Sequence, residues 1–269
     1  MGRFAFRFAC ILVLSGAGPA RAQSDYDCMI EAKQAIEIRS PVEAMIESVR
    51  VKRGDAVTKG QILVTLESGP ERAAFALAQS RAQAVGEIKS AEARVDITLK
   101  KLKRAEELVK QNFISANARD EAEAENKLAN EELRRAKENQ QISQYEAKRA
   151  GEVLAMRTIR SPFTGVVVEV LLKPGEFGAI TFKDPILKLA EIDPLHVEVI
   201  LPVRIYGSIK PGQRASVIPE QPVGGRYETV VKIVDKVVDA ASGTFGVRLE
   251  LSNRKGELPA GVRCKVQFH

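Results

Sequence analysis

The sequence contains few aromatic residues and few of the side chains that enzymes and metal sites use. Aromatic residues make up 5% of the 269 residues, tryptophan is absent, and the only histidines are His196 and His269. These histidines lie far apart, and neither has the close spacing to His, Cys or carboxylate side chains that a zinc site needs. No Gly-x-Ser-x-Gly motif and no phosphate-binding glycine loop occurs. We therefore expect no catalytic site, no metal site and no cofactor.

Charge of one sign is not concentrated in any segment. The formal net charge is +6, but basic residues are interspersed with acidic ones along the chain. A nucleic-acid-binding surface usually combines a basic stripe with side chains that stack on bases or read a groove. The sequence shows neither feature, so we expect no nucleic acid among the partners.

Long apolar runs are also missing. The apolar run over residues 8–14 is too short for a bilayer core of about 30 Å, which needs roughly 20 apolar residues. Arg3 and Arg7 precede this run, and Ala20-Arg21-Ala22 follows it with small residues at alternate positions. This order is typical of a secretory signal peptide over residues 1–22, cleaved after Ala22. An uncleaved N-terminal anchor is the alternative interpretation.

Cysteine is scarce, and only Cys28 and Cys264 remain after the predicted cleavage. In the oxidising compartment to which a signal peptide leads, a single pair of cysteines favours a disulfide. The two residues stand near opposite ends of the exported chain. Two buried free thiols are the alternative, because pairing cannot be read from sequence alone.

A short repeat occurs on either side of a long central segment. Residues 38–49 and residues 159–170 both begin Ile-Arg-Ser-Pro and continue into an apolar run. Each copy then reaches a glycine turn and a second apolar run, the turns being Lys52-Arg53-Gly54-Asp55 and Lys173-Pro174-Gly175-Glu176. Short apolar or β-branched runs separated by Gly and Pro predict strands. The two copies therefore predict two halves of one small β-module.

The segment between the halves predicts a helical hairpin. It contains no proline after Pro70 and is rich in strong helix formers. Apolar and small residues recur every seven positions, which predicts two helices packed as an antiparallel coiled coil with a break at 112–117. Arg81 interrupts one row. Each arm of about 40 residues would be about 60 Å long at 1.5 Å per residue. The rows are Ala74, Ile88, Val95, Leu102 and Val109; Leu77, Ala84, Ala91, Thr98 and Ala105; and Ala122, Ala129, Ala136, Ser143 and Ala150.

The C-terminal segment after Asp193-Pro194 predicts a small antiparallel β-barrel. Five apolar runs are separated by turn signals such as Lys210-Pro211-Gly212 and Pro259-Ala260-Gly261. Several short strands bounded by such turns are typical of a small barrel. The predicted strands are 196–201, 215–218, 227–237, 245–251 and 262–268.

The two Ser-Pro strands, Ser40-Pro41 and Ser161-Pro162, together with the glycine turns resemble the halves of the lipoyl/biotinyl fold. The whole order resembles the periplasmic adaptor (membrane fusion, HlyD-like) proteins of resistance-nodulation-division (RND) and related efflux pumps. The resemblance implies an elongated α+β protein, with a split lipoyl-like barrel-sandwich hybrid, an inserted antiparallel coiled-coil hairpin and a small antiparallel β-barrel. The corresponding domains are 1–22 (signal peptide), 23–67 (N-terminal segment and first lipoyl half), 68–156 (hairpin), 157–191 (second lipoyl half) and 192–269 (β-barrel).

The same resemblance implies a function without catalysis. Such a protein would be exported to the periplasm and associate with the inner membrane through its partners. It would link an inner-membrane transporter to an outer-membrane TolC-like channel for the export of small molecules, and it would form a homo-oligomeric ring. Larger relatives continue into a membrane-proximal domain built from both chain ends, and we expect that domain to be absent here.

A second resemblance lies near the predicted hairpin tip. Adaptors that dock a TolC-like channel share an Arg, a Leu four residues later and a Ser seven residues beyond that. Arg104, Leu108 and Ser115 match this spacing. Residues at i and i+4 share a helix face, so Arg104 and Leu108 would face the channel together. Simple helix packing for Leu108 and a turn or N-cap role for Ser115 are the competing interpretation.

Two other functions have similar sequence requirements. An adaptor of an ABC-type secretion or export system uses similar parts, although such adaptors usually keep a transmembrane anchor. A lipoyl or biotin carrier would present its acceptor Lys on the turn between the two halves, where this chain has the helical segment. Glu43-Ala44-Met45 resembles a biotinyl motif, but Ile46 stands where the Lys would be, and motif matches out of context are often false.

Overall fold

The computed structural model describes residues 25–178 and 185–269, which form two compact units. One unit contains the described residues between Ala35 and Ala190, and the other contains residues 25–34 together with Glu191–His269. The chain passes from one unit to the other within two long strands, β1 (Tyr26–Ile38) and β8 (Leu187–Pro202). The predicted signal peptide lies outside the described residues.

The first unit contains the predicted β-module. Strands β2 (Ala44–Val49) and β4 (Ile62–Leu66) come from the first half, and β6 (Gly165–Val170) comes from the second. Pairing mixes the halves, since β2 pairs with β7 (Phe177–Gly178) and β4 with β5 (Thr158–Arg160). Strand β3 (Ala56–Val57) likewise pairs with β6, which also pairs with β8. Neither half can therefore complete its sheets alone.

The internal repeat extends to individual hydrogen bonds. Ser40 and Ser161 are buried, and the Oγ of each donates to the carbonyl oxygen two residues later. In both glycine turns the acidic side chain accepts from the first lysine's backbone N–H, at 2.7 Å in Lys52–Asp55 and 2.8 Å in Lys173–Glu176. These shared local bonds explain why the repeat was visible in the sequence.

The two glycine turns also join the halves to each other. Gly54 and Gly175 both have φ of +91°, a backbone conformation that glycine adopts at little cost. The Gly54 N–H donates to the Val167 carbonyl at 2.8 Å, and the Gly175 N–H donates to the Ile46 carbonyl at 2.9 Å. Each half therefore supplies the turn that pairs with a strand of the other half.

The second unit is a closed barrel of six strands. The order is β1-β12-β9-β10-β11-β8, and β8 pairs again with β1. The strands that follow β8 in the chain are β9 (Arg214–Pro219), β10 (Tyr227–Val234), β11 (Thr244–Leu251) and β12 (Val262–Phe268), with a 3₁₀ turn at Val203–Ile205. The sequence predicted the five C-terminal strands. The sixth is β1, whose N-terminal part closes the barrel.

The predicted disulfide is present in this barrel. Cys28 of β1 lies directly opposite Cys264 of β12 in the antiparallel ladder, with a Cα–Cα distance of 4.8 Å. This separation is within the usual range for a disulfide. Both residues are buried in the barrel core. The bond therefore fixes the closing strand to its neighbour.

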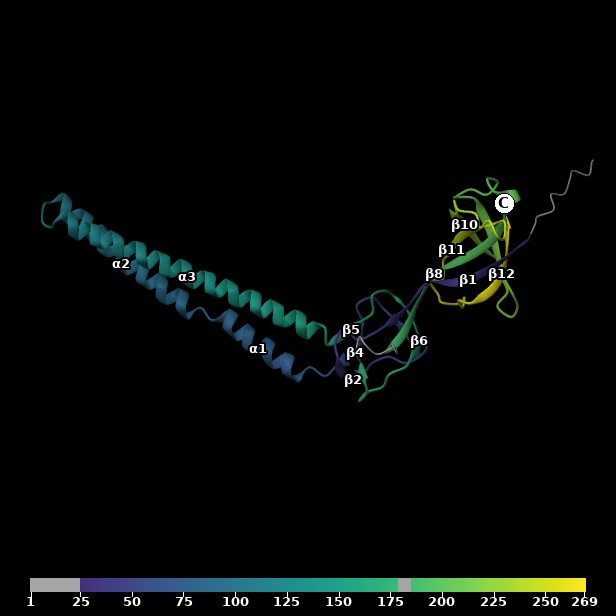
Figure 1. The fold of residues 1–269 in the computed structure, drawn as a ribbon, viewed down its shortest axis with the longest axis horizontal. Coiled ribbons are helices and arrows are strands. Elements are labelled where there is room, and N and C mark those ends of the chain that lie inside the picture. The colour runs from purple at the N-terminus through teal and green to yellow at the C-terminus, as the bar shows by residue number, and fades with distance from the viewer. Residues whose placement is uncertain (1–24, 179–184) are drawn as a thin grey trace, which may run out of the picture. The chain divides into compact units, whose positions relative to one another are not determined.

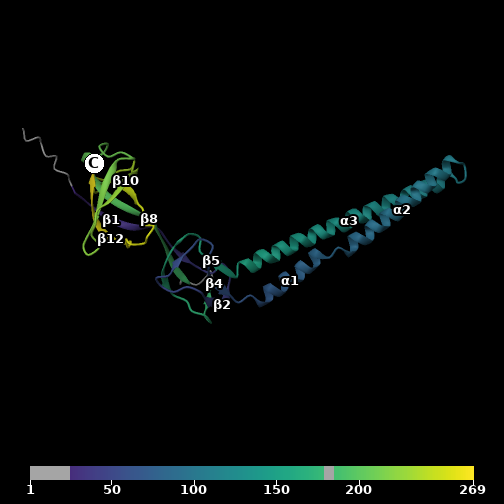
Figure 2. The ribbon, with the colours of Figure 1, turned by 180° about the vertical axis from the view of Figure 1, so that it is seen from behind.

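The helical hairpin is inserted between β4 and β5 of the first unit. Its elements are α1 (Gly69–Gln83), α2 (Gly86–Lys110) and α3 (Ala116–Ala155). Figures 1 and 2 show α1 and α2 following one another along α3, so the two shorter helices make one arm and α3 makes the other. The predicted fold class is confirmed: a split barrel-sandwich module with an inserted hairpin, followed by a β-barrel.

Candidate functional site at the hairpin tip

The seam between α2 and α3 is built from small residues, as the seven-residue rows predicted. Ala105, Ala122 and Ala129 are buried, and the larger members of the rows from Ile88 onward are half-buried. Small side chains allow two helices to approach closely along such a seam. The predicted coiled-coil register is therefore confirmed for α2 and α3.

One polar contact lies within this seam. Thr98 is 3% exposed, and its Oγ1 accepts a hydrogen bond of 3.0 Å from Asn126 Nδ2 of α3. The same hydroxyl lies 3.0 Å from the Arg94 carbonyl, to which it donates. Asn126 is half-buried, and its bond to the buried Thr98 hydroxyl forms only in one alignment of the helices. A single polar residue in a seam can fix the register. This contact fixes the register of α2 against α3.

The predicted register is wrong in α1. Ala74 and Leu77 of the predicted rows are exposed, whereas Phe75, Ala78 and Ala82 are half-buried. Phe75 lies against Gly151 of α3, where an added Cβ would come within 3.1 Å of the Phe75 ring.

The cause is a break between α1 and α2. Ala84 has an extended ψ of 115°, and α2 restarts after Val85 without a side-chain cap. A continuous helix would bring Arg81 to the seam, seven residues before Ile88, and burying an unpaired guanidinium is costly. The break shifts the register by one residue, so that Ala82 faces the seam and Arg81 is exposed.

Salt bridges join the arms outside the seam. Lys101 Nζ lies 2.6 Å from Glu125 Oε2, and Arg94 Nη1 lies 3.2 Å from Glu132 Oε2. The Lys101 ammonium donates a hydrogen bond to Glu125 and, with its charge, lowers the pKa of that carboxyl. Exposed pairs of this kind contribute little stability each.

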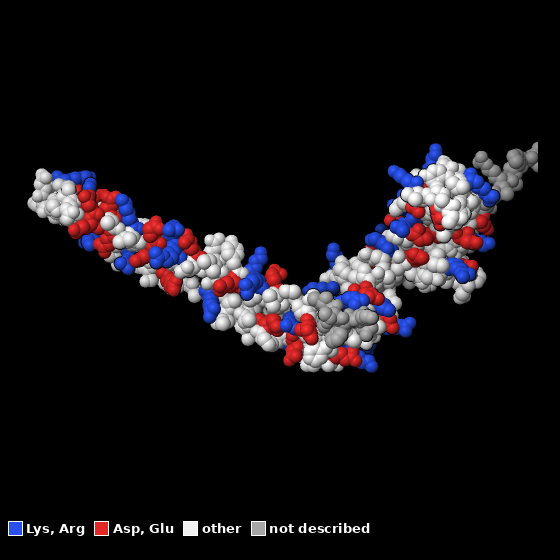
Figure 3. Space-filling view, viewed as in Figure 1, with Lys and Arg blue, Asp and Glu red and all other residues white. Residues whose placement is uncertain are grey.

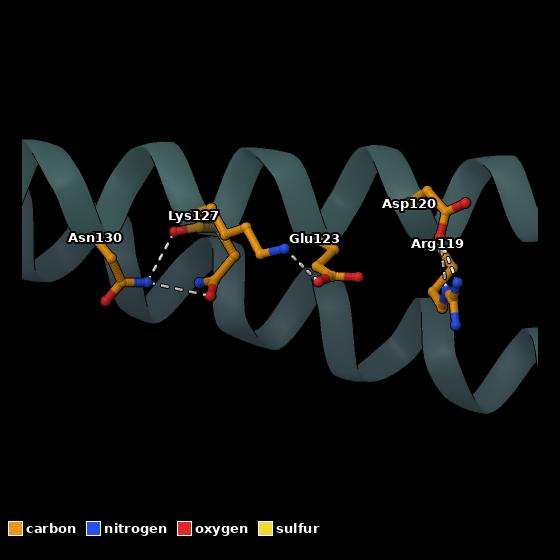
Figure 4. A network of polar contacts seen from close by, with 6 residues as sticks. Arg119, Asp120, Glu123, Lys127 and Asn130 are labelled. Atoms are coloured by element: carbon orange, nitrogen blue, oxygen red, sulfur yellow. Dashed lines mark hydrogen bonds and ion pairs between the residues drawn. The ribbon is translucent and has the colours of Figure 1, made fainter.

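The outer surface of α3 near the tip carries further pairs within the helix. Figure 4 shows Lys127 reaching Glu123, and Arg119 reaching Asp120. The Lys127 hydrogen bond and charge lower the pKa of Glu123, and the bond to Asp120 raises the pKa of Arg119. These side chains remain exposed.

The tip itself is a tight loop between Lys110 and Ala116. Asn112 has φ of +59°, the only positive φ of a non-glycine residue among the described residues. The Asn112 N–H donates to the Val109 carbonyl and the Phe113 N–H to the Leu108 carbonyl, both at 2.9 Å. This pair of bonds is the Schellman motif, which ends a helix on a left-handed residue. Helix α2 therefore stops at a fixed position.

Ser115 is the N-cap of helix α3. Its backbone is extended (φ −74°, ψ 154°), and its Oγ accepts a hydrogen bond from the Ala118 N–H at 3.3 Å. This is the geometry of an N-cap, which satisfies one backbone donor of the first helical turn. The six-residue predicted break at 112–117 is thus a shorter loop, capped on both sides.

The three predicted site residues lie at this end of the hairpin. Arg104 is exposed on α2, with its Nε 3.3 Å from the Lys100 carbonyl, and Leu108 is 39% exposed. Ser115 is exposed in the loop. The sequence interpretation missed Phe113, which is 72% exposed at the tip. A lone aromatic beside an Asn in a break between helices was the available signal.

The described residues contain no group of three or more His, Cys, Asp or Glu side chains that could hold a metal ion. His196 lies in β8 opposite Glu250, and the ring of His269 makes a 2.7 Å hydrogen bond with Ser216 Oγ. Within the same residues, no helix combines the length and apolar character that a membrane span requires.

Two family models cover most of the chain. Residues 34–191 match a CzcB-like barrel-sandwich hybrid domain, and residues 194–269 match a CusB-like β-barrel domain. The first match alone covers more than half of the chain. The chain belongs to the periplasmic adaptor (membrane fusion) family of RND-type efflux systems. The resemblance seen in the sequence is thereby confirmed.

Individual adaptors are similar over nearly the whole chain. The cation efflux system protein CzcB of Alcaligenes sp. (strain CT14) is 23% identical over 246 residues, which cover 90% of this chain and 44% of that protein. The chain thus spans less than half the length of this curated relative. Among solved structures, MacA from Actinobacillus actinomycetemcomitans is 19% identical with a TM-score of 0.70, covering 91% of this chain and 78% of that one. ZneB from Cupriavidus metallidurans is 22% identical with a TM-score of 0.50, covering 91% and 97%.

Proposed function

We propose that this adaptor links an inner-membrane efflux transporter to an outer-membrane TolC-like channel, and that the hairpin tip is the part that docks the channel. The observation that carries the proposal is the hairpin: two arms in a fixed register, ending in a capped loop with Arg104 and Leu108 exposed on one helix face. Membership of the adaptor family supports it. The role is that of a scaffold, without catalysis.

The tip is suited to this role because its parts are held in place. The Thr98–Asn126 contact fixes the register, and the two caps fix where each helix ends. A contact surface that is ordered before binding loses less conformational entropy when the partner arrives. The hairpin can therefore present its loop to a partner in one geometry.

Several copies would surround the conduit. Family resemblance supports a homo-oligomeric ring, in which the same two surfaces of each copy meet head to tail. Such contacts close into a ring only when the rotation between neighbours permits. The export of cargo then follows from sealing the passage, so the adaptor needs no selective cargo site.

The names of relatives suggest a cargo class. One relative is called a cobalt-zinc-cadmium resistance protein, and we propose divalent metal cations as cargo of this system too. Deleting the gene should then lower tolerance of cobalt, zinc or cadmium, measured as growth in graded metal. Unchanged tolerance of all three metals, with lowered tolerance of organic drugs, would reject the cation assignment and keep the efflux role.

Two substitutions with matched controls test channel docking. Arg104→Asp and Leu108→Ser should abolish binding of the adaptor to the purified channel in detergent, measured by interferometry. Arg135→Asp and Leu128→Ser make the same changes at exposed residues of α3 away from the tip and should bind like the wild type. A surface substitution alters stability by about 0.5 kcal/mol or less, so all four variants should fold. Wild-type affinity in both tip variants would reject the docking assignment.

A further inference from the structure

The loop between the arms and the first three residues of α3 carry no charge. Residues 111–118, between Lys110 and Arg119, contain no acidic or basic side chain, although charged residues are dense along the rest of the hairpin. The loop end of the hairpin is correspondingly mostly white in Figure 3. A partner at the apex cannot be held there by ion pairs. Its contact with residues 111–118 must come from apolar surface and hydrogen bonds.

Phe113 provides the most exposed apolar side chain at the apex, next to the half-buried Ile114. With 72% of its surface exposed, it is the most exposed large hydrophobic residue of the described hairpin. Aromatic side chains gain much from being covered and often anchor interfaces. Within the described residues of the hairpin, no aromatic ring contact involves Phe113.

The loop geometry associates Phe113 with Leu108. In a Schellman motif the residue after the left-handed position and the residue three before the cap commonly make an apolar contact. These positions are Phe113 and Leu108, joined through the 2.9 Å bond from the Phe113 N–H to the Leu108 carbonyl. Leu108 is also partly exposed, at 39%. The motif therefore places two exposed apolar side chains at one corner of the tip.

Ser115 and Asn112 have roles within the chain. The Ser115 hydroxyl already accepts from the Ala118 N–H, so it caps α3. Asn112 takes the left-handed conformation that ends α2, which Asn tolerates better than most residues. Both residues determine where the corner formed by Leu108 and Phe113 points.

We propose that Phe113 and Leu108 together form an apolar anchor that enters an uncharged pocket at the periplasmic end of the TolC-like channel, and that Ser115 and Asn112 position this anchor without touching the channel. This inference rests on the proposed function and names the contact within it. The lack of charge over residues 111–118 is what selects an uncharged pocket as the complement.

Binding of the full-length adaptor to the purified channel tests the anchoring role of Phe113. Phe113→Ser should weaken binding about tenfold or more, because an anchoring aromatic loses its buried area. Phe113→Leu keeps apolar area and should stay within a few-fold of wild type. Leu128→Ser, at a residue 65% exposed on α3, is the control and should bind normally. Wild-type affinity in Phe113→Ser, with binding lost in Leu108→Ser, would overturn the anchor and leave docking intact.

Conservative variants test the positioning residues. Ser115→Asn retains an uncharged N-cap side chain and should bind like wild type, whereas Ser115→Ala should lose helicity at the tip together with affinity. Asn112→Gly keeps the left-handed conformation and should bind normally, whereas Asn112→Val opposes it and should bind weakly. Loss of binding in Ser115→Asn, with unchanged circular dichroism, would show that Ser115 contacts the channel and would overturn its positioning role.

A photo-reactive amino acid in place of Phe113 identifies the protein that this side chain contacts. Cross-linking in the mixture of adaptor and purified channel should yield an adduct with the channel. An adduct only with a second adaptor copy would assign the anchor to self-association and overturn the proposal. If the wild-type adaptor binds no channel in the same assay, the proposed function fails first, and the anchor fails with it.

Discussion

Single side chains make bonds that define the local geometry of both units. Ser40 and Ser161 each form the same buried bond to a carbonyl two residues on, and Cys28 joins Cys264 across the barrel ladder. At the hairpin, Thr98 and Asn126 form a polar contact across the seam. These bonds act locally, and each can be removed by a single substitution.

The Lys101–Glu125 pair predicts a pH dependence of hairpin stability. The pKa of Glu125 is lower in the folded protein than in the unfolded chain, mainly because Lys101 donates a hydrogen bond to it. Its contribution to stability is present above the unfolded pKa and is lost as the pH falls through the folded pKa. The melting temperature of the wild type should therefore fall more steeply below about pH 4.5 than that of Lys101→Met.

Lys103→Met is the control for this experiment. Lys103 is exposed on the same helix and belongs to no salt bridge of the described residues. The melting temperature of Lys103→Met should show the same pH dependence as that of the wild type. Identical pH profiles for all three proteins would show that the Lys101–Glu125 pair contributes nothing measurable.

We predict that the disulfide stabilises the barrel by holding its closing strand β1 in place. Cys28 and Cys264 are separated by 236 positions, and the chain-entropy model gives a stabilisation of roughly 5 kcal/mol for a loop of this size. The double variant Cys28→Ser/Cys264→Ser should unfold at lower urea concentration. Amide hydrogens of residues 26–34 should exchange faster in it, because β1 loses its covalent attachment.

Wild-type protein treated with reductant should behave like the double variant. Mass spectrometry of the untreated, alkylated protein should show the two cysteines linked in one peptide pair. Two alkylated cysteines in the untreated protein would contradict the disulfide.

The helices and strands differ in how far their sequence determines them. The seam of α2 and α3 follows seven-residue rows, which are local patterns, so sequence alone predicted which residues are buried there. The break at Ala84–Val85 was not predicted, because it depends on the cost of bringing Arg81 against α3. Arg81 in an otherwise apolar row was the visible warning. Strand β1 was also missed, because its barrel partner β12 lies more than 200 residues away.

The candidate site was predictable to a similar extent. The break in the seven-residue rows located the tip, and the resemblance to channel-docking adaptors pointed to Arg104, Leu108 and Ser115 there; their docking role stays a prediction. Phe113 could not be ranked from sequence because its exposure depends on the left-handed conformation of Asn112. The hydrogen bond from the Ala118 N–H to Ser115 Oγ shows the N-cap role of Ser115, which the sequence left open.

The small-residue seam predicts that added volume is not tolerated. Ala129 is 1% exposed between the arms, so Ala129→Leu should overpack the seam and cost about 1–3 kcal/mol. Ala124→Leu places the same side chain on the exposed face of α3 and should change stability little. Circular dichroism melts of the two variants give the comparison. Equal melting temperatures for both variants would contradict the packing of Ala129 against α2.

At the scale of the whole molecule, the hairpin is an insertion that the β-module does not need for closure. Strands β4 and β5 pair as antiparallel neighbours, with the Leu66 N–H donating to the Arg157 carbonyl at 2.8 Å. A short glycine turn in place of residues 69–155 would therefore join them directly. We expect this variant to fold both units, because the halves interlock through their own strands and glycine turns.

We therefore expect the hairpin and the two β-units to bind different partners. If the tip docks the channel, removal of the hairpin should abolish channel binding and leave binding to the transporter unchanged. The hairpin deletion thus tests the docking role without relying on any one side chain.

The most direct test of the adaptor role is affinity purification from membranes, followed by quantitative mass spectrometry of the partners. The wild-type protein should bring down both an RND transporter and a TolC-like channel. The Arg104→Asp variant and the hairpin deletion should retain the transporter and lose the channel, while Arg135→Asp retains both. Recovery of the channel with the hairpin deletion, or of neither partner with the wild type, would contradict the account.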